Sequence, residues 1–483
     1  MKLEGFEFGF ADAIKEYSRN PEIFERAFCD PRDVVKKLIE SYQFLLIGRK
    51  GVGKSAYSSK IQSIADNSDS LYAYPMNLSD FEFSTFAKTG IDDDVLGTQK
   101  YKTSWDFLLL WSIYKILFNE MQMTEVKEIS QIVYLLDSLG FSVDDGYKTD
   151  VTKLSKLKVG ANIKIFDVAF EKEFKTQPAN YLERISIVTE EMLNVLSSSY
   201  LNERNIMIII DGLDDVLRYK KNKMEIIASL IRSADYINDF MMKSHKKIKV
   251  VLLLREDIIA LVNDPDINKI IQDGAIFINW NNRLNDLKEL VNMRFSLSVS
   301  EKEATRCWDM IFPNKIKGKN SWDYVLDYTL YKPRDVLQFL KFCQNEYPDH
   351  EKLTLSETQN VLKIYSNKYF IEEMKNELSG FISDELIVSI PSVFRRLGGR
   401  AFDVAELNRL TNEQNMKHEV SIEETKTELM YLFDAGYVGQ LVSGGKTSKR
   451  SVIFKYRNPT ARIDYYQKFI THKGLHSGLG VRL

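Results

Sequence analysis

Five short apolar runs recur along the first part of the chain, separated by segments of helical periodicity. They span residues 44–47, 70–78, 206–211, 247–254 and 275–280. The third and fourth runs are nearly continuous, which is typical of strands buried on both faces of a parallel sheet. Helical patterns lie between the runs at residues 56–64 and, with an amphipathic pattern, at 105–121. We therefore expect a three-layer α/β fold with a parallel sheet and a ligand at the carboxyl ends of its strands.

Residues 122–182 interrupt this alternation and look inserted. Within them, residues 156–170 alternate apolar and polar positions, which predicts a half-buried hairpin. Its neighbourhood carries lysines at 153, 156, 158 and 164. A solvated polar face is the favoured interpretation of these lysines, and a contact with nucleic acid or a partner is the alternative.

The pattern becomes fully helical from residue 283, with helices expected at 284–295 and within 322–347. After Ser379, helices are expected at 384–397, 404–410 and 421–434, and strands at 437–442 and 451–456 on either side of SGGKTSKR. Three helices followed by a hairpin is a winged-helix order. The predicted domains are thus 1–282 with the insertion, a helical lid at 283–378, and a winged helix with a basic tail at 379–483.

A glycine-rich turn follows the first apolar run. The stretch FLLIGRKGVGKSAYS, residues 44–58, satisfies G-x-x-x-x-G-K-[ST] between a strand and a helix, the context that a phosphate-binding loop requires. Its glycines let successive backbone N–H groups point at a pyrophosphate, and the following helix N-terminus adds positive charge. A chance glycine turn is the alternative. The predicted cofactors are ATP and Mg²⁺, with Lys54 on the phosphates and Ser55 on the metal. The predicted loop contacts are Gly48, Gly51, Val52, Gly53, Lys54, Ser55 and Ala56.

Residues 1–43 lead straight into this loop's strand. They carry helical patterns around 21–28 and 31–42, each beginning near a proline that suits a first helical turn. The segment either covers the sheet or lies beside the nucleotide base, and no residue in it identifies a base contact.

Acidic residues follow the third apolar run. The segment IMIIIDGLDDV, residues 206–216, delivers Asp211 at the end of the strand, where a carboxylate can hold Mg²⁺ through water. Downstream of a phosphate-binding loop this is a Walker B arrangement. Asp214 and Asp215 follow shortly after, and capping of the next helix is an alternative role for Asp215.

The pattern D-G-L-D-D resembles the NACHT branch of the STAND ATPases, in which an acidic pair follows the first aspartate by three residues. The adjacent acidic pair of most AAA+ proteins is absent, because Gly212 follows Asp211. The resemblance implies that Asp211 holds Mg²⁺ and that Asp214 or Asp215 orients the attacking water. It covers about residues 1–378, and the winged-helix order extends it to nearly the whole chain.

The same resemblance implies two nucleotide sensors. Arg255, at the end of the fourth run, matches sensor 1, and an ion pair with Glu256 or a neighbour is the alternative. Pro333 and Arg334 match the lid motif in which a proline packs by the nucleotide and an arginine acts as sensor 2. Tyr331 replaces the usual glycine of that motif. Pro333 as a simple first residue of a helix is the alternative.

Together these features predict an ATPase that acts as a molecular switch, with slow hydrolysis until a partner supplies another cation. The expected partners are a second copy of the chain or a separately encoded effector. The compact layout resembles a poorly characterised bacterial P-loop family, some of whose relatives sit among antiphage defence genes. No repeat of 20 to 50 residues and no segment that could be a nuclease is evident in the sequence.

A second hypothesis is an ATP-regulated DNA-binding protein resembling the origin-recognition ATPases. The third helix of the predicted winged helix argues against base reading, because Glu423, Glu424, Glu428 and Asp434 outnumber Lys426. The basic excess of the wing, which is SGGKTSKR with its flanking strands, and of the tail after it suits a phosphate backbone or an acidic partner protein, with Asp464 as the one acid there. Their cations are Lys446, Lys449, Arg450, Lys455, Arg457, Arg462, Lys468, Lys473 and Arg482. A solvated basic tail is the alternative.

Composition sets the remaining limits. A chain of 483 residues with 44% hydrophobic and 28% charged residues is typical of a globular protein of two or three domains. A net charge of −2 does not mark the whole molecule as a nucleic-acid binder. We find no membrane span or signal peptide and expect a cytoplasmic protein without a membrane partner. The three cysteines suit buried reduced thiols, and no histidine pattern predicts a zinc site.

Overall fold

The computed structural model describes residues 1–78, 83–89, 101–157, 181–201, 204–213, 223–262, 264–281, 284–414, 419–443 and 450–481. The chain forms two compact units. The sheet unit consists of Asp33–Gly48 and Lys60–Phe277. The helical unit consists of Met1–Arg32, Arg49–Ser59 and Ile278–Leu483.

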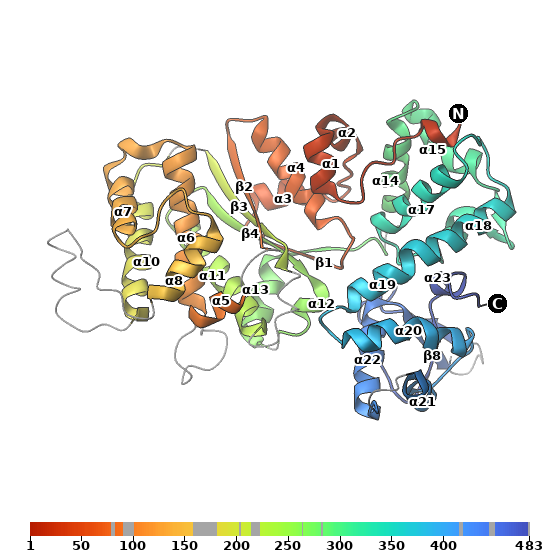
Figure 1. Ribbon diagram of the computed structural model, residues 1–483. Coiled ribbons are helices and arrows are strands. Elements are labelled where there is room, and N and C mark those ends of the chain that lie inside the picture. The colour runs from red at the N-terminus through yellow and green to blue at the C-terminus, as the bar shows by residue number, and fades with distance from the viewer. Residues whose placement is uncertain are drawn as a thin grey trace. The chain divides into compact units, whose positions relative to one another are not determined.

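The sheet unit is built on five strands in the order β2-β3-β4-β1-β5 (Figure 1). They are β1 (Leu45–Gly48), β2 (Leu71–Asn77), β3 (Asn205–Asp211), β4 (Ile248–Arg255) and β5 (Ala275–Ile278). Strand β2 pairs with β3, β3 with β4, and β4 with β1, all in parallel. The predicted parallel α/β sheet is confirmed, and its strands end within two residues of their predicted limits.

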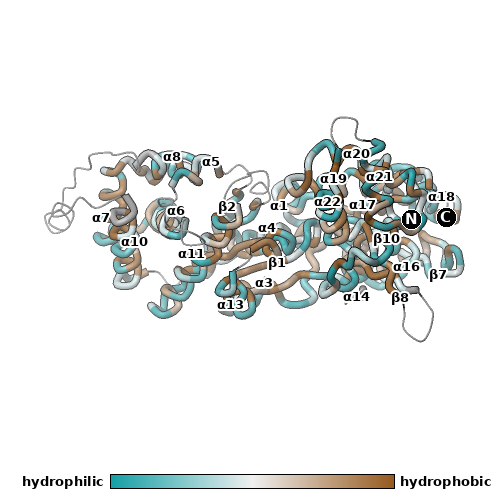
Figure 2. Tube along the Cα trace, turned by 90° about the horizontal axis from the view of Figure 1, so that it is seen from below, coloured by the Kyte–Doolittle hydropathy of each residue, from teal (hydrophilic) through white to brown (hydrophobic). Residues whose placement is uncertain are grey.

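Strand β4 lies between β1 and β3, so the strand before the glycine-rich turn and the strand that carries Asp211 are not neighbours. Every residue of β1 is buried, and the interiors of β3 and β4 are almost entirely buried. The tube is correspondingly brown at β1 in Figure 2. Burial of both faces explains why these sequences read as continuous apolar runs.

The helix predicted at 105–121 is not amphipathic. Helix α6 (Lys102–Lys115) buries side chains around its whole circumference and continues as a π-helical turn, Ile116–Glu120. The reason is that α10 (Tyr181–Ser198) and α11 (Lys223–Lys243) both pack against it. The indole N–H of Trp105 donates to the Ile226 carbonyl of α11 at 3.0 Å.

The predicted insertion adds α7 (Lys127–Ser138) and α8 (Tyr147–Leu157) to this helical layer. Asp150 of α8 accepts hydrogen bonds from Trp111 and Lys115, at 3.3 and 2.6 Å, which fastens α8 to α6. The predicted hairpin is wrong at its start, because Lys156 and Leu157 belong to α8. Residues 158–170, the rest of that prediction, lie outside the described residues.

The described part of the sheet unit also contains four shorter α-helices. They are α3 (Val34–Glu40), α5 (Phe83–Phe86), α12 (Glu256–Ile259) and α13 (Pro265–Gly274). Helix α3 lies within the helical pattern predicted around 31–42 and begins three residues after Pro31, at Val34. Asp33, just before it, takes a left-handed φ of 52°.

The helical unit begins with α1 (Ala13–Arg19) and α2 (Pro21–Ala27), and α2 opens at Pro21 as predicted. A buried bidentate ion pair joins Glu16 of α1 to Arg294 of α14, at 2.6 and 2.7 Å. The remaining helices are α14 (Leu284–Ser296), α15 (Glu301–Ile311), α16 (Ser321–Leu326), α17 (Pro333–Glu346), α18 (Leu355–Tyr365) and α19 (Ile371–Leu378). Strands β6 (Lys315–Ile316) and β7 (Lys319–Asn320) form a short hairpin before α16.

The end of the helical unit has the predicted order of three helices followed by strands (Figure 1). The helices are α20 (Asp384–Leu397), α21 (Val404–Gln414) and α22 (Ile422–Ala435). Strands β8 (Val438–Ser443), β9 (Arg450–Ile453) and β10 (Lys468–Thr471) form an antiparallel sheet in the order β10-β8-β9, and α23 (Lys473–His476) follows. Strand β10 was not predicted. The three cysteines are buried and free, as predicted.

Among the described residues, none of the helices combines the length and the apolar character needed to cross a bilayer.

Candidate nucleotide-binding site

The glycine-rich turn leaves β1 at Gly48 and enters α4 (Lys54–Asp66) at Lys54. Gly51 and Gly53 take φ values of 81° and 100°, which only glycine adopts readily. A Cβ added at Gly53 would meet no atom within 4 Å, so the loop is open on that side. Positive φ at alternate loop residues and a helix N-terminus fit a phosphate group, because both orient backbone N–H groups toward an anion.

Side chains from elsewhere in the helical unit hold this loop. The buried indole of Trp280 donates to the Val52 carbonyl at 3.1 Å. The Arg49 guanidinium donates to the Ala435 carbonyl at the end of α22 and lies 5.8 Å from the ring centre of Tyr456. Neither Arg49 nor Trp280 was predicted, because both partners are hundreds of residues away and no local pattern marks them.

Lys54 occupies the predicted position at the first residue of α4. Its ammonium donates to the Arg49 carbonyl at 3.1 Å. The loop therefore supplies an internal acceptor for the cation that we assign to the phosphates. Ser55 and Ala56 follow in the first turn of the helix.

The start of α17 lies beside the loop at Gly51. A Cβ at Gly51 would lie 3.4 Å from Cδ of Lys332 and 3.7 Å from Cβ of Arg334. Pro333 is the first residue of α17, which is the alternative considered for it. Tyr331 takes φ 57°, so the backbone keeps a glycine-like conformation although a tyrosine stands there. Lys332 was not predicted as a site residue.

Charged side chains at this helix start all have partners. Lys332 forms a buried ion pair with Glu377, and Arg334 lies 3.5 Å from a carboxylate oxygen of Glu373. Asp335 accepts from the Leu330 N–H at 2.8 Å and from the Tyr369 hydroxyl at 3.0 Å. Burial lowers the pKa of Lys332 and raises that of Asp335.

In the sheet unit, the carboxyl ends of β3 and β4 carry Asp211 and Arg255. The register pairs Arg255 with Gly48, the last residue of β1. A carboxylate oxygen of Asp211 accepts from the N–H of Gly212 at 2.7 Å, and Gly212 takes φ 80°. Asp214 and Asp215 lie outside the described residues, so their predicted role in orienting water stays a prediction.

Arg255 is buried and forms a bidentate ion pair with Asp257, at 2.9 and 2.5 Å. The pair with a neighbour that we considered as an alternative is therefore present, with Asp257 in place of Glu256. Its role as a sensor stays a prediction. Asp257 also accepts from the Ile258 N–H at 3.0 Å, which fixes the carboxylate at the start of α12.

Several cations of the basic tail pair with acidic residues that lie outside the tail. Asp327, at the end of α16, is paired with Lys319, Arg457 and Lys473 at 2.7, 3.3 and 3.1 Å. These cations hold the pKa of Asp327 below its usual value, although burial alone would raise it. Lys455 lies 3.9 Å from Asp434. The expectation that these cations face only Asp464 is wrong, because the fold brings distant acids to them.

Helix α22 also exposes fewer acidic side chains than the sequence predicts. Glu428 is buried rather than exposed, and burial raises its pKa to about 7. Glu424 closes a capping box with Ser421, and Glu423 pairs with Lys426 at 2.6 Å. Helix α22 therefore presents fewer uncompensated acids than its sequence suggests.

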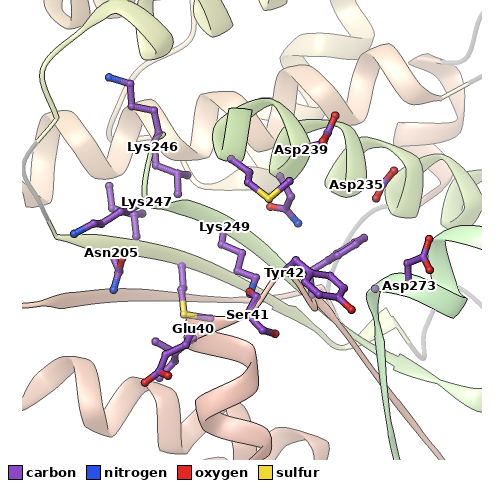
Figure 3. A pocket seen from close by; sticks show the side chains of 18 of the residues that line it. Glu40, Ser41, Tyr42, Asn205, Asp235, Asp239, Lys246, Lys247, Lys249 and Asp273 are labelled. Carbon is purple, nitrogen blue, oxygen red and sulfur yellow. The ribbon is translucent and has the colours of Figure 1, made fainter. Parts of the chain in front are cut away.

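A cavity of about 680 Å³ lies at the opposite, amino-terminal edge of the sheet (Figure 3). Its lining includes Asn205 at the start of β3 and Lys249 near the start of β4. The Lys249 ammonium donates to the carbonyls of Leu38 and Ser41 at 2.6 and 2.5 Å, so it caps the end of α3. Burial lowers its pKa to about 8. None of the predicted site residues in the described part of the chain lines this cavity.

Comparison with known proteins adds similarities in sequence and in structure. A family model described as "FunZ-associated C-terminal helical domain" matches residues 285–372, within α14 to α19. The chain is 20% identical over 495 residues to the putative transposon gamma-delta 80.3 kDa protein of Escherichia coli (strain K12), covering 98% of this chain and 67% of that protein. It is 29% identical over 77 residues to Allergen Alt a 2 of Alternaria alternata, covering 16% of this chain and 40% of that protein.

Two solved structures are also similar. The ORC2 protein of Aeropyrum pernix, solved as ADPNP-ADP complexes, has 12% identity and a TM-score of 0.42, with 96% of this chain and 93% of that chain covered. Cdc6p of Pyrobaculum aerophilum has 9% identity and a TM-score of 0.29, with 96% of each chain covered.

Proposed function

We propose that this protein is an ATP-binding and hydrolysing molecular switch of STAND/AAA+ type. The observation that carries the proposal is that three residues of the phosphate-binding loop lie against residues far away in the sequence. Arg49 contacts Ala435 and Tyr456, Gly51 faces the start of α17, and Val52 accepts from Trp280. A ligand that changes this loop necessarily acts on those contacts.

The proposed division of labour follows the chemistry of each group. The loop amides, Lys54 and the N-terminus of α4 bind the phosphates, and Ser55 with Asp211 holds Mg²⁺. When bound, Mg²⁺ neutralises part of the phosphate charge. Asp214 or Asp215 orients water, and Arg255 and Arg334 respond to the γ-phosphate.

The direct test is equilibrium binding of a fluorescent ATP analogue, with Mg²⁺, to the wild-type chain and to Lys54→Ala. We expect binding by the wild type and about tenfold or greater weakening in the variant, because the cation on the β and γ oxygens is lost. Lys50→Ala is the matched control, since it removes the same charge from a position of the loop that the motif leaves variable. A wild-type protein that binds no ATP, or equal affinities for all three proteins, would contradict the proposal.

A molecular switch acts on a partner. We propose that this partner is a second copy of the chain or a separately encoded effector protein. Asp214→Asn combined with Asp215→Asn should trap the ATP state and enrich the complex in affinity purification and sizing from the native host. Defence against phage is the setting that the family resemblance suggests. A monomer with no co-purifying protein in either state would contradict the partner proposal. The division into domains at 282 and 378 and the winged-helix assignment stay part of this proposal.

The second candidate is ATP-regulated DNA binding through the wing and tail. Its support is that Arg462 and Lys468 are exposed and that Glu428 does not face outward. The pairing of Arg457 and Lys473 with Asp327 weakens it. DNA binding through the remaining cations must weaken steeply as salt rises, and anisotropy across a salt series measures that slope. Absence of binding at low salt would eliminate this candidate.

A further inference from the structure

One face of α19 and the turn before it holds the start of α17 through three polar pairs. Glu377 pairs with Lys332, Glu373 with Arg334, and Tyr369 donates to Asp335. The three residues on the α19 side are spaced four apart, so they lie on one face of the helical segment. The start of α17 also lies beside the loop at Gly51. These pairs therefore connect the phosphate-binding loop to α19.

The two ion pairs differ in how easily they can open. The side chains of Lys332 and Glu377 are 3% and 6% exposed, and opening that pair would leave a buried charge without its partner. Arg334 is 33% exposed and Glu373 is 12% exposed. Arg334 can therefore leave its partner and remain hydrated, whereas Lys332 cannot.

Arg334 also lies beside the loop. A Cβ built at Gly51 would lie 3.7 Å from its Cβ and 3.8 Å from its Cδ. Its guanidinium presents a fork of donors that suits a carboxylate or a phosphate equally well. An additional phosphate at this loop thus offers Arg334 a second anionic partner.

We propose that Glu373 is a positioning residue that competes with the terminal phosphate of ATP for Arg334. This inference rests on the proposed nucleotide site and specifies how that site distinguishes ATP from ADP. In the structure Arg334 lies 3.5 Å from a carboxylate oxygen of Glu373. When the terminal phosphate takes Arg334, the mostly buried Glu373 carboxylate loses its cation. That loss weakens the binding of ATP. It does not affect the binding of ADP, which lacks the terminal phosphate, because a ligand shifts an equilibrium only through its differential contacts.

The exchange has a consequence for the rest of the helical unit. Helix α19 ends at Leu378, six residues before α20 begins at Asp384. Release of Arg334 removes one of the three pairs that fix α19 to α17. The buried Lys332–Glu377 pair stays in place, and α19 can move about it. The elements that follow α19 are therefore the part of the chain that responds to the terminal phosphate.

The test compares the affinities of the full-length wild type, Glu373→Gln and Glu372→Gln for ADP and for a non-hydrolysable ATP analogue. Glu372→Gln is the matched control, because it removes the same charge from the preceding residue. The Glu372 carboxylate pairs on the surface with Lys375. We expect Glu373→Gln to tighten the ATP analogue about three- to tenfold and to change ADP binding less than about twofold. Glu372→Gln should change neither affinity by more than about twofold.

Adding Arg334→Ala decides whether the effect acts through Arg334. In the Arg334→Ala background, Glu373→Gln should no longer tighten the ATP analogue, and such non-additivity reports a direct interaction. If the wild type binds both nucleotides and Glu373→Gln leaves the ATP-to-ADP ratio unchanged, the competition is wrong and the nucleotide site stands. A wild type that binds neither nucleotide contradicts both.

Discussion

Tyr331 shows how a single residue departs from the pattern of its motif without changing the backbone. Glycine is favoured there because the chain needs a positive φ, and Tyr331 adopts φ 57° nonetheless. Its ring packs edge-on against Tyr456 at 5.3 Å and lies 5.0 Å from the Arg457 guanidinium. These contacts offset a conformational cost of about 1–2 kcal/mol.

The left-handed backbone at Tyr331 predicts that a glycine replacement is more stable than an alanine replacement, the reverse of the usual order. Tyr331→Gly and Tyr331→Ala both lose the ring contacts, but only alanine keeps the cost of the left-handed backbone. We expect Tyr331→Gly to be the more stable of the two by roughly 0.5–1 kcal/mol, although glycine is usually the less stable choice. Thermal or urea unfolding measures the difference. An alanine variant as stable as the glycine variant would show that the backbone here is unstrained.

At the residue scale, the place of a residue on a helix or strand could be predicted from a local motif, whereas its contacts with distant partners could not. The positions of Lys54, Ser55 and Asp211 follow from motifs of a few residues, and the structure places them at the predicted helix start and strand end. The contacts of Arg49 and the pairing of the tail with Asp327 join residues far apart in sequence. A single sequence carries no signal for such pairs.

Helices α6 and α22 show the limits of periodicity for whole elements. The pattern of α6 suggested one exposed face, but neighbouring helices cover it on all sides. In α22 the acids looked like a surface stripe, yet Glu428 faces the interior, and one of its oxygens lacks a hydrogen-bond partner among the described residues. Periodicity identified both helices correctly and misjudged what covers them.

Burial of Glu428 predicts a loss of stability as pH rises. The folded chain retains the Glu428 proton up to about pH 7, whereas the ordinary value is 4.5, so the unfolded chain releases its proton first. The free energy of unfolding therefore falls between about pH 4.5 and 7 and is flat above. The contribution is at most about 3 kcal/mol, from the size of the shift. Glu428→Gln should remove it.

Urea unfolding of the wild type and Glu428→Gln at pH 5 and pH 8 measures this contribution. The variant should be clearly more stable than the wild type at pH 8 and differ less at pH 5. Glu423→Gln is a suitable control, because that carboxylate is exposed on the same helix. Parallel pH profiles for the wild type and Glu428→Gln would show that Glu428 is ionised in the folded chain.

At the scale of the whole molecule, the proposed switch depends on contacts within the helical unit. The phosphate-binding loop touches residues at the start of α17 and at the end of α22, which belong to the predicted lid and winged helix. The parallel sheet and the order of helices and strands could be predicted from apolar patterns. The contact between loop and carboxyl-terminal elements could not, because it depends on packing between segments that no local pattern relates.

The most direct test of the central claim is hydrogen exchange of residues 422–443, which form α22 and β8, in the presence of MgATP and of MgADP. Backbone exchange reports local opening, so a switch must alter it when the bound nucleotide changes. The account predicts faster exchange in this segment with MgATP than with MgADP in the wild type, and no nucleotide dependence in Lys54→Ala. Identical exchange with both nucleotides, in a wild-type protein saturated with each, would contradict the claim that this chain is an ATP-driven switch.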